Sequence, residues 1–289
     1  MIIAALYGGL GNQMFQYAAA RAAALRSGQD LALDLSWFTR ENANCQRRRY
    51  LLDKFQIKAT IATENDLELI KAAQIMNGDL QQRDASKLKI IKEHSFEFQG
   101  ELRSEEGSAY LDGYWQTEKY FLDFADQIRS ELRICSEIPF KDLPTITHIP
   151  SRPAVAIHVR RGDFVNDPKT FEAHGLCSLD YYYKAATLLI ARLGSPRFFV
   201  FSDEVDWCRS NLLLPTEADY VGNSDVEDPT MDFRLMSQCE HFVNANSSFS
   251  WWASWLARNP EKIVIAPQKL IEGDWLNTKD YFPLHWIRL

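Results

Sequence analysis

Two adjacent arginines follow an apolar run in the second half of the chain, within the sequence HVRRGD at residues 158–163. The apolar run predicts a buried strand, and ligands of α/β sheets bind at the carboxyl ends of strands. Because side chains alternate along a strand, His158 and Arg160 are expected on one face and Arg161 on the other. A guanidinium binds phosphate through two parallel charged hydrogen bonds. A surface turn held by an Arg–Asp salt bridge is the alternative, and the position after a strand favours the phosphate site.

Two serines, Ser247 and Ser248, stand between a predicted strand and a predicted helix. Serine is a preferred N-cap residue, which is one interpretation of the pair. A helix start also points backbone N–H groups outward and binds anions, so the two roles are compatible. Aromatic residues follow the serines, and we expect them in the core: Phe249, Trp251 and Trp252.

A glycine-rich turn, GGLGNQ at residues 8–13, precedes an alanine-rich segment near the start of the chain. Such a turn lets the backbone approach a diphosphate. The spacing differs from the G-x-G-x-x-G fingerprint and the P-loop lysine is missing, so a nicotinamide or P-loop site is a weak match. Asn12 and Gln13 beside the glycines indicate a polar ligand rather than tight packing alone.

Carboxylates occur at two further element ends. Ser202, Asp203 and Glu204 end a predicted strand, and Asp232 opens a predicted helix. A buried carboxylate can accept both N–H groups of a guanine edge. Alternatively, each acid stabilises a helix N-terminus through the helix dipole, which the local sequence favours for Asp203 and Glu204.

Alternating strand and helix signals must position these residues. Strand, helix and strand are predicted at 2–6, 14–27 and 31–35, residues 36–56 read as a solvated loop, and a helical stretch covers 121–132. In the second half strands are predicted at 154–159, 197–201, 241–244 and finally 262–266, with helices at 181–193, 204–212, 228–238 and 250–258. Prolines between residues 139 and 153 suit a linker. We therefore predict an α/β protein with two facing Rossmann-like domains, 1–150 and 151–289, and a ligand site in the cleft between them.

The composition excludes several classes of protein. Hydrophobic residues make up 46% and charged residues 25%, as in a globular protein, and the net charge of -7 argues against nucleic acid as a partner. Five widely separated cysteines include no C-x-x-C pair, which argues against a zinc knuckle or a disulfide framework. The apolar start is too short for a membrane span and lacks the basic start of a secretory signal, so we expect a cytoplasmic protein.

Taken together, these segments resemble the α-1,2-fucosyltransferases of glycosyltransferase family 11. The resemblance rests on the sequences GGLGNQMFQY, HVRRGD, FSDE and NSSFSWW, in this order, and on GYWQ at 113–116 and HGLC at 174–177. It extends from residue 8 to about residue 267, which is nearly the whole chain.

The resemblance implies a GT-B-like fold and an inverting transfer of L-fucose from GDP-β-L-fucose to the 2-hydroxyl of a terminal β-galactoside. It implies no metal or other cofactor, residues 1–150 mainly on the acceptor side, and residues 151–289 on the donor side. A lipid-linked glycan acceptor would bring the enzyme to the inner face of the membrane. By resemblance, Arg160 contacts the pyrophosphate with Arg161 and His158 in support. The other donor-binding residues implied are Gly9, Gly11 and Asn12 near the fucose, Asp232 at the guanine, Ser247 and Ser248 at the phosphates, and Phe249, with Gln13, Ser202, Asp203 and Asn246 as weaker candidates.

The sequence also suggests how the leaving GDP is stabilised. No Asp-x-Asp triplet occurs, whereas metal-dependent transferases use such a pair to hold a cation. Arg160 and the serine helix start can stabilise the charge instead. Asp163 is the nearest candidate for the base that deprotonates the acceptor, although it could equally orient Arg161, and a dissociative reaction needs no base. Alternatives for the whole protein are a fucosyltransferase with another acceptor, such as a protein, and a GDP-sugar binding module without turnover.

Overall fold

The computed structural model describes residues 1–39, 48–76, 88–100, 102, 107–135, 152–222, 229–272 and 277–289. The chain forms two compact units. The first contains Met1–Cys135 and Asn277–Pro283, and the second contains Ser136–Leu276 and Leu284–Leu289. The domain boundary predicted at residue 150 lies outside the described residues.

The first unit is built on a parallel sheet whose order, within the described residues, is β3-β2-β1-β5-β4. Its strands are β1 (Ile2–Ala5), β2 (Leu31–Asp34), β3 (Thr60–Ile61), β4 (Leu88–Lys92) and β5 (Ser108–Asp112). All residues of β1 and β2 are buried, as expected for continuous apolar runs in a parallel sheet. β1 pairs with β2 and β5, so the residues that follow these three strands lie at one edge.

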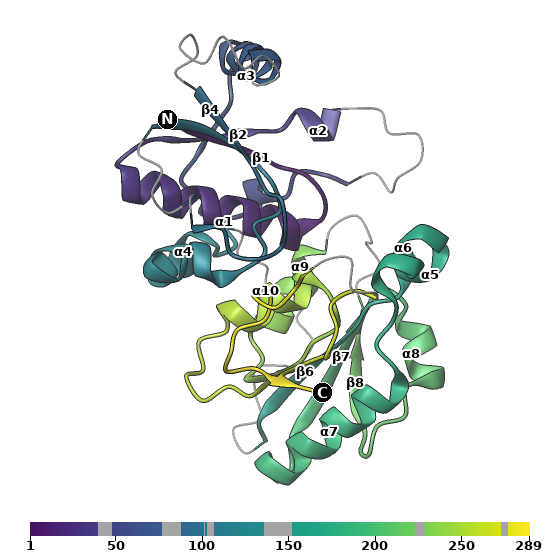
Figure 1. The fold of residues 1–289 in the computed structure, drawn as a ribbon. Helices are drawn as coiled ribbons and strands as arrows, with labels where there is room; N and C mark the ends of the chain where they lie inside the picture. The colour runs from purple at the N-terminus through teal and green to yellow at the C-terminus, as the bar shows by residue number, and fades with distance from the viewer. Residues whose placement is uncertain are drawn as a thin grey trace. The chain divides into compact units, whose positions relative to one another are not determined.

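Helix α1 (Leu10–Ser27) lies along this sheet (Figure 1). It ends at Gly28, whose φ of 63° is left-handed and whose N–H bonds back to Ala24 and Leu25. Within the described residues the unit has one further long helix, α3 (Glu64–Met76). The remaining helices described there are short: α2 (Ser36–Thr39), η1 (Leu52–Lys54), η3 (Glu118–Tyr120), η4 (Leu122–Phe124) and α4 (Ala125–Glu131).

The solvated loop predicted for 36–56 is partly wrong. Leu51, Leu52 and Phe55 are buried in the unit, because these apolar side chains outweigh the basic residues that precede them. Residues 40–47 of the predicted loop lie outside the described part of the chain. For residues 64–97 the sequence mixes helix and strand signals and predicts no single element. The structure has α3 and β4 there, on either side of residues that it does not describe.

The second unit contains a parallel sheet of order β11-β10-β9-β6-β7-β8 within the described residues. Its strands are β6 (Ala154–Val159), β7 (Arg197–Ser202), β8 (Ala218–Val221), β9 (His241–Val243), β10 (Val264–Ala266) and β11 (Ile287–Arg288). Counted along this unit alone, the order is 3-2-1-4-5-6, the order of dinucleotide-binding Rossmann domains. The strand order reverses between β6 and β9, and ligands of such sheets bind beside this switch point.

Two strands of this sheet were not predicted. The prediction that 262–266 is the final strand is wrong, because β11 pairs with β10 beyond it. β8 and β11 lie at the two edges of the sheet and are short and only partly buried, so they lack the apolar run that identifies β6. The helices of the unit are α5 (Gly162–Asn166), α6 (Pro168–His174), α7 (Leu179–Leu193), α8 (Val205–Asn211), α9 (Thr230–Ser237) and α10 (Ser248–Leu256).

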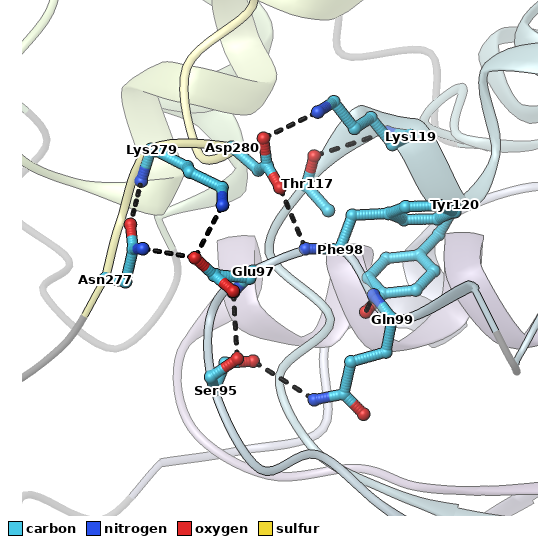
Figure 2. Close-up of polar contacts among 10 residues, drawn as sticks. All are labelled: Ser95, Glu97, Phe98, Gln99, Thr117, Lys119, Tyr120, Asn277, Lys279 and Asp280. Atoms are coloured by element: carbon cyan, nitrogen blue, oxygen red, sulfur yellow. Dashed lines mark hydrogen bonds and ion pairs between the residues drawn. The ribbon is translucent and has the colours of Figure 1, made fainter.

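The segment Asn277–Pro283 completes the first unit although it comes near the end of the chain. Asp280 accepts hydrogen bonds from the Phe98 N–H at 2.9 Å and from Lys119 Nζ at 2.5 Å (Figure 2). Lys279 pairs with Glu97 at 2.6 Å, and Tyr281 is fully buried. These contacts fix the segment onto the loop that follows β4 and onto Lys119, which lies between Thr117 and Phe121 in η3 (Glu118–Tyr120). In the described residues we find no helix with both the length and the apolar character needed to cross a bilayer.

Candidate active site

The switch point of the second unit brings together two of the segments singled out in the sequence. Ile157 of β6 pairs with Val243 of β9, so the two strands end side by side. The arginine pair follows β6, and the serine pair follows β9. The rings of His158 and Phe249 lie 5.4 Å apart, which shows that the two segments are in contact.

Arg160 is held by a carboxylate from the neighbouring strand end. Its Nη1 atom lies 2.7 Å from Asp203 Oδ2, and the two side chains are 22% and 15% exposed. Asp203 Oδ1 also accepts the Arg161 N–H at 3.0 Å, so this acid forms an ion pair rather than acting only as a helix N-terminal acid. A Cβ at Gly162 would lie 2.5 Å from Asp203 Oδ2, so only glycine leaves room for the carboxylate. The guanidinium is thereby preorganised at the sheet edge, with part of its surface open to a ligand.

Arg161 points to different partners. Its Nε donates to Glu204 Oε2 at 2.8 Å, and its guanidinium lies 3.5 Å from the centre of the Trp207 ring. Cation–π packing of this kind holds a guanidinium in place and leaves its charge intact. The two guanidinium groups therefore pair with different carboxylates, Asp203 for Arg160 and Glu204 for Arg161.

His158 is a buried, neutral side chain. Burial, together with the nearby charge of Arg160, lowers its pKa to about 3. Its Nδ1 atom has no hydrogen-bond partner in the described structure. The ring packs on Phe249, which in turn contacts Phe233 of α9 at 5.3 Å. A neutral ring in this position supports the helix start rather than contributing a charge to it.

Ser247 and Ser248 begin α10. Ser247 is the N-cap, and its side chain accepts the Phe249 N–H at 3.3 Å. The prediction that Phe249, Trp251 and Trp252 belong to the core is confirmed for the two tryptophans, which are essentially fully buried, whereas Phe249 at the helix start is only half-buried. These tryptophans anchor α10 against the unit, and its N-terminus lies at the switch point, where a helix start can bind an anion.

Asn246 and Asp232 stand beside this helix start in different roles. Asn246 is buried, and its Nδ2 donates to the His174 carbonyl at 2.8 Å while its Oδ1 faces the Cys177 sulfur at 3.6 Å. Both ends of the amide therefore fasten the segment after α6 to the end of β9. Asp232 lies half-buried in the first turn of α9, the helix that packs against α10.

A cavity of about 250 Å³ adjoins the arginines. It lies between the end of β6, the start of α7 and the Trp207 side of α8, and its lining residues are Val159, Arg160, Arg161, Leu176, Cys177, Ser178, Leu179, Tyr182 and Trp207. Burial raises the pKa of the Cys177 thiol to about 11, so this thiol is protonated near neutral pH. Ser202 lies outside this lining, buried at the end of β7, where its Oγ accepts the Glu204 N–H at 3.0 Å.

The glycine turn belongs to the first unit, between β1 and α1. Gly8 has a φ of 79°, and Gly9 is the N-cap of α1, while Gly11 is buried within the helix. Gln13 is fully buried and bonds the Gly8 and Arg49 carbonyls and the Leu51 N–H. Its side chain therefore closes the turn internally. Asn12 Oδ1 accepts from Gln116 at 2.9 Å and links the turn to the loop after β5.

Three site features were missed or stay untested. Asp163 lies in α5, and the placement of its side chain is outside the described structure. Trp207 was not predicted, although an aromatic residue in the helix after the FSDE segment was a visible signal. Glu93, whose carboxylate accepts the N–H groups of Tyr114 and Trp115, was also missed. It directly follows β4, a strand that the mixed signals of its sequence did not predict.

Comparisons with known proteins agree along the whole chain. A sequence model of the family described as Glycosyl transferase family 11 matches residues 2–289. The chain is 32% identical over 298 residues to an alpha-1,2-colitosyltransferase of Escherichia coli, covering 100% of this chain and 99% of that protein. It is 30% identical over 303 residues to the O-antigen biosynthesis glycosyltransferase WbnK of Escherichia coli, covering 98% and 99%.

A solved structure shows the same fold. A mutant of Arabidopsis thaliana FUT1 in complex with GDP matches with a TM-score of 0.55 at 10% identity, covering 91% of this chain and 69% of that chain. Together with the two parallel α/β units, this likeness gives the chain a GT-B-type fold, as the sequence predicted.

Proposed function

The chain belongs to glycosyltransferase family 11, and from this premise we propose that it moves L-fucose from GDP-β-L-fucose to the 2-hydroxyl of a terminal β-galactoside. The observation that carries the proposal is the pairing of two loops at one switch point. One loop holds Arg160 against Asp203, and the other begins α10 at Ser247 and Ser248. A guanidinium group and a helix N-terminus at the same sheet edge suit the binding of a diphosphate.

The chemistry of transfer explains what these groups would do. When the bond between fucose and the β-phosphate breaks, negative charge grows on GDP while the sugar becomes oxocarbenium-like. Donors fixed in advance stabilise such charge without having to reorganise during the reaction. Arg160, fixed by Asp203, is the donor of this kind that we assign to the β-phosphate. Arg161 adds positive charge from its position on Trp207.

The remaining roles are part of the same proposal. The half-buried Asp232 is assigned to the guanine edge, because a carboxylate accepts two N–H groups from it. Gly9, Gly11 and Asn12 are assigned to the fucose. Asp163 is assigned as the base that takes the proton of the acceptor hydroxyl while that oxygen attacks the anomeric carbon from the face opposite GDP, which inverts the configuration.

A second donor has a specific observation in its favour. The relative that matches the whole chain at 32% identity is an alpha-1,2-colitosyltransferase. Colitose is L-fucose without its 3-hydroxyl, so the two donors differ by one oxygen atom. A site that hydrogen-bonds the 3-hydroxyl of fucose would reject GDP-colitose strongly, whereas a site without this bond would accept both sugars.

The test incubates the purified protein with GDP-fucose or GDP-colitose and a panel of β-galactosides: lactose, N-acetyllactosamine and galactosyl-β-1,3-N-acetylgalactosamine. Product linkage is determined by NMR, and GDP release is followed with and without acceptor. We expect an α-1,2-linked product with GDP-fucose. A product formed only with GDP-colitose would show that colitose, and not fucose, is the donor sugar. A different linkage would show that another hydroxyl of the acceptor is used. GDP binding without any product would indicate a binding module without turnover.

A further inference from the structure

A second group of side chains gathers at the carboxyl edge of the first sheet. Tyr7 follows β1, Tyr114 follows β5, and Glu93 follows β4, and these three strands are neighbours in the order β1-β5-β4. The rings of Tyr7 and Tyr114 pack edge to face with centres 4.9 Å apart, and Phe96 packs against Tyr114 at 6.1 Å. All three residues are half-buried, so none of them is fully enclosed in the core.

Glu93 fixes the backbone that presents Tyr114. Its carboxylate accepts the Tyr114 N–H at 2.6 Å and the Trp115 N–H at 3.0 Å. Trp115 has a φ of 57°, in the left-handed region that residues other than glycine rarely adopt. Strain of this kind persists only where the surroundings hold it, and it occurs often at functional sites. Here the Glu93 carboxylate and the fully buried Trp115 ring hold it.

The surroundings of Glu93 are built for close approach. A Cβ at Gly113 would lie 2.4 Å from the Glu93 Cβ, so only glycine allows this contact. Burial raises the pKa of Glu93 to about 7, although its two backbone hydrogen bonds act in the opposite direction. Burial also raises the pKa of Tyr7 and of Tyr114, so both phenols keep their protons and can donate hydrogen bonds.

Aromatic rings with polar tips beside a carboxylate match the chemistry of a pyranose. A sugar ring has a face of C–H groups that packs on aromatic carbon, and a rim of hydroxyls that donate to or accept from phenols and carboxylates. We propose that Tyr7, Phe96 and Tyr114 form an aromatic platform that binds the acceptor sugar, with Glu93 as the positioning residue that holds Tyr114. This inference rests on the proposed function, because it names the residues that bind the second substrate.

The platform also connects to the glycine turn. Gln116, two residues beyond the strained Trp115, donates to Asn12 Oδ1 at 2.9 Å. The backbone held by Glu93 thus sets the position of Gln116 as well as that of Tyr114. Loss of Glu93 should move both together, which a purely local packing role would not require.

The experiment measures acceptor and donor KM separately, using the best acceptor of the β-galactoside panel. Tyr114→Ala is expected to raise the acceptor KM by about tenfold, the scale of one lost aromatic contact. Tyr114→Phe keeps the ring and should stay within about threefold. Tyr183→Ala, which removes a 48% exposed tyrosine ring on α7, is the matched control and should change neither constant.

Further variants separate positioning from folding. Glu93→Ala should raise the acceptor KM in the wild-type background and have little further effect beside Tyr114→Ala, because both changes remove one correctly placed ring. Tyr7→Ala tests the platform from its other side if the Tyr114 variant fails to fold. Donor KM and GDP release without acceptor should stay unchanged in Tyr114→Ala and Tyr7→Ala, because these changes leave the hydrogen bond between Gln116 and Asn12 in place.

Two kinds of result would overturn the inference and leave the proposed function standing. One is an unchanged acceptor KM in folded Tyr114→Ala and Tyr7→Ala enzymes that still form product. The other is a rise in donor KM alone, which would assign the rings to the donor sugar. If wild-type enzyme transfers neither sugar to any acceptor of the panel, the proposed function itself fails, and the platform assignment with it.

Discussion

Replacement of Arg160 by alanine tests the central electrostatic argument. The guanidinium lies 2.7 Å from Asp203 and keeps 22% of its surface exposed, so it is held in place but can still meet a phosphate. Removal of one preorganised donor of this type costs about 10²–10³ in kcat, or about 2.7–4 kcal/mol. Because the charge on GDP develops in the transition state, kcat and kcat/KM should fall together. Arg160→Lys keeps the charge but not the planar fork, so its loss should be intermediate.

The assay follows GDP release at saturating donor and acceptor, with unfolding curves recorded for each variant. Arg209→Ala is the matched control: this arginine pairs with Asp206 at 2.8 Å, but the two side chains are 53% and 96% exposed. A surface pair of this kind contributes little, so the control should keep its kcat within about twofold. A folded Arg160→Ala enzyme with kcat within about threefold of wild type would refute the assignment, since a preorganised donor is worth far more.

Three further outcomes follow from single contacts. Gly162→Ala should lower kcat by about tenfold, on the scale of a partly lost donor, because its Cβ would lie 2.5 Å from Asp203 Oδ2; steady-state kinetics beside an unfolding curve checks this. The pKa of His158 is lowered to about 3 in the folded chain, so below pH 6.5 the unfolded chain binds a proton that the folded chain does not bind. The free energy of unfolding, measured with urea, should therefore fall by up to about 1.4 kcal/mol for each pH unit below 6.5. His158→Phe should remove this part of the slope, and an unchanged slope would contradict the buried neutral ring. Asp280→Ala should lower the free energy of unfolding by about 1–3 kcal/mol, whereas the fully exposed Asp126→Ala should not.

Much of the fold is readable from the sequence where burial dominates. β6 has the predicted bounds, because all six of its residues are buried and the chain becomes charged only at Arg160, directly after the strand. α7 begins at Leu179, two residues before the predicted start, because the Ser178 side chain caps it through the Tyr181 N–H. The edge strands β8 and β11 were missed for the opposite reason, since partly exposed short strands need little apolar sequence.

The candidate site was predictable as segments but not as contacts. Val159 pairs with Ser202 across β6 and β7, so the residues that follow, Arg160 and Asp203, are neighbours. Reading Asp203 from its own surroundings favoured a helix N-terminal acid, because the sequence alone does not say which strands are adjacent. The contacts of Glu93 were even harder to predict. Its carboxylate binds the backbone N–H groups of Tyr114 and Trp115, and the residue type of a glutamate does not indicate which N–H groups it binds.

The chemistry of the two sheet edges differs in the way that the two proposed substrates differ. At the edge of the second unit, Arg160 and the serine-capped start of α10 offer positive charge and N–H donors, which a diphosphate requires. At the edge of the first unit, tyrosine rings held by Glu93 offer apolar faces with neutral hydroxyls, which suit a sugar, beside the Gly9-capped start of α1 that we assign to the fucose. Fold alone does not produce this difference, since both edges are carboxyl ends of parallel strands. It therefore reflects the side chains placed there: the arginine held by Asp203 favours the diphosphate at the second edge, and the tyrosine rings favour a sugar at the first.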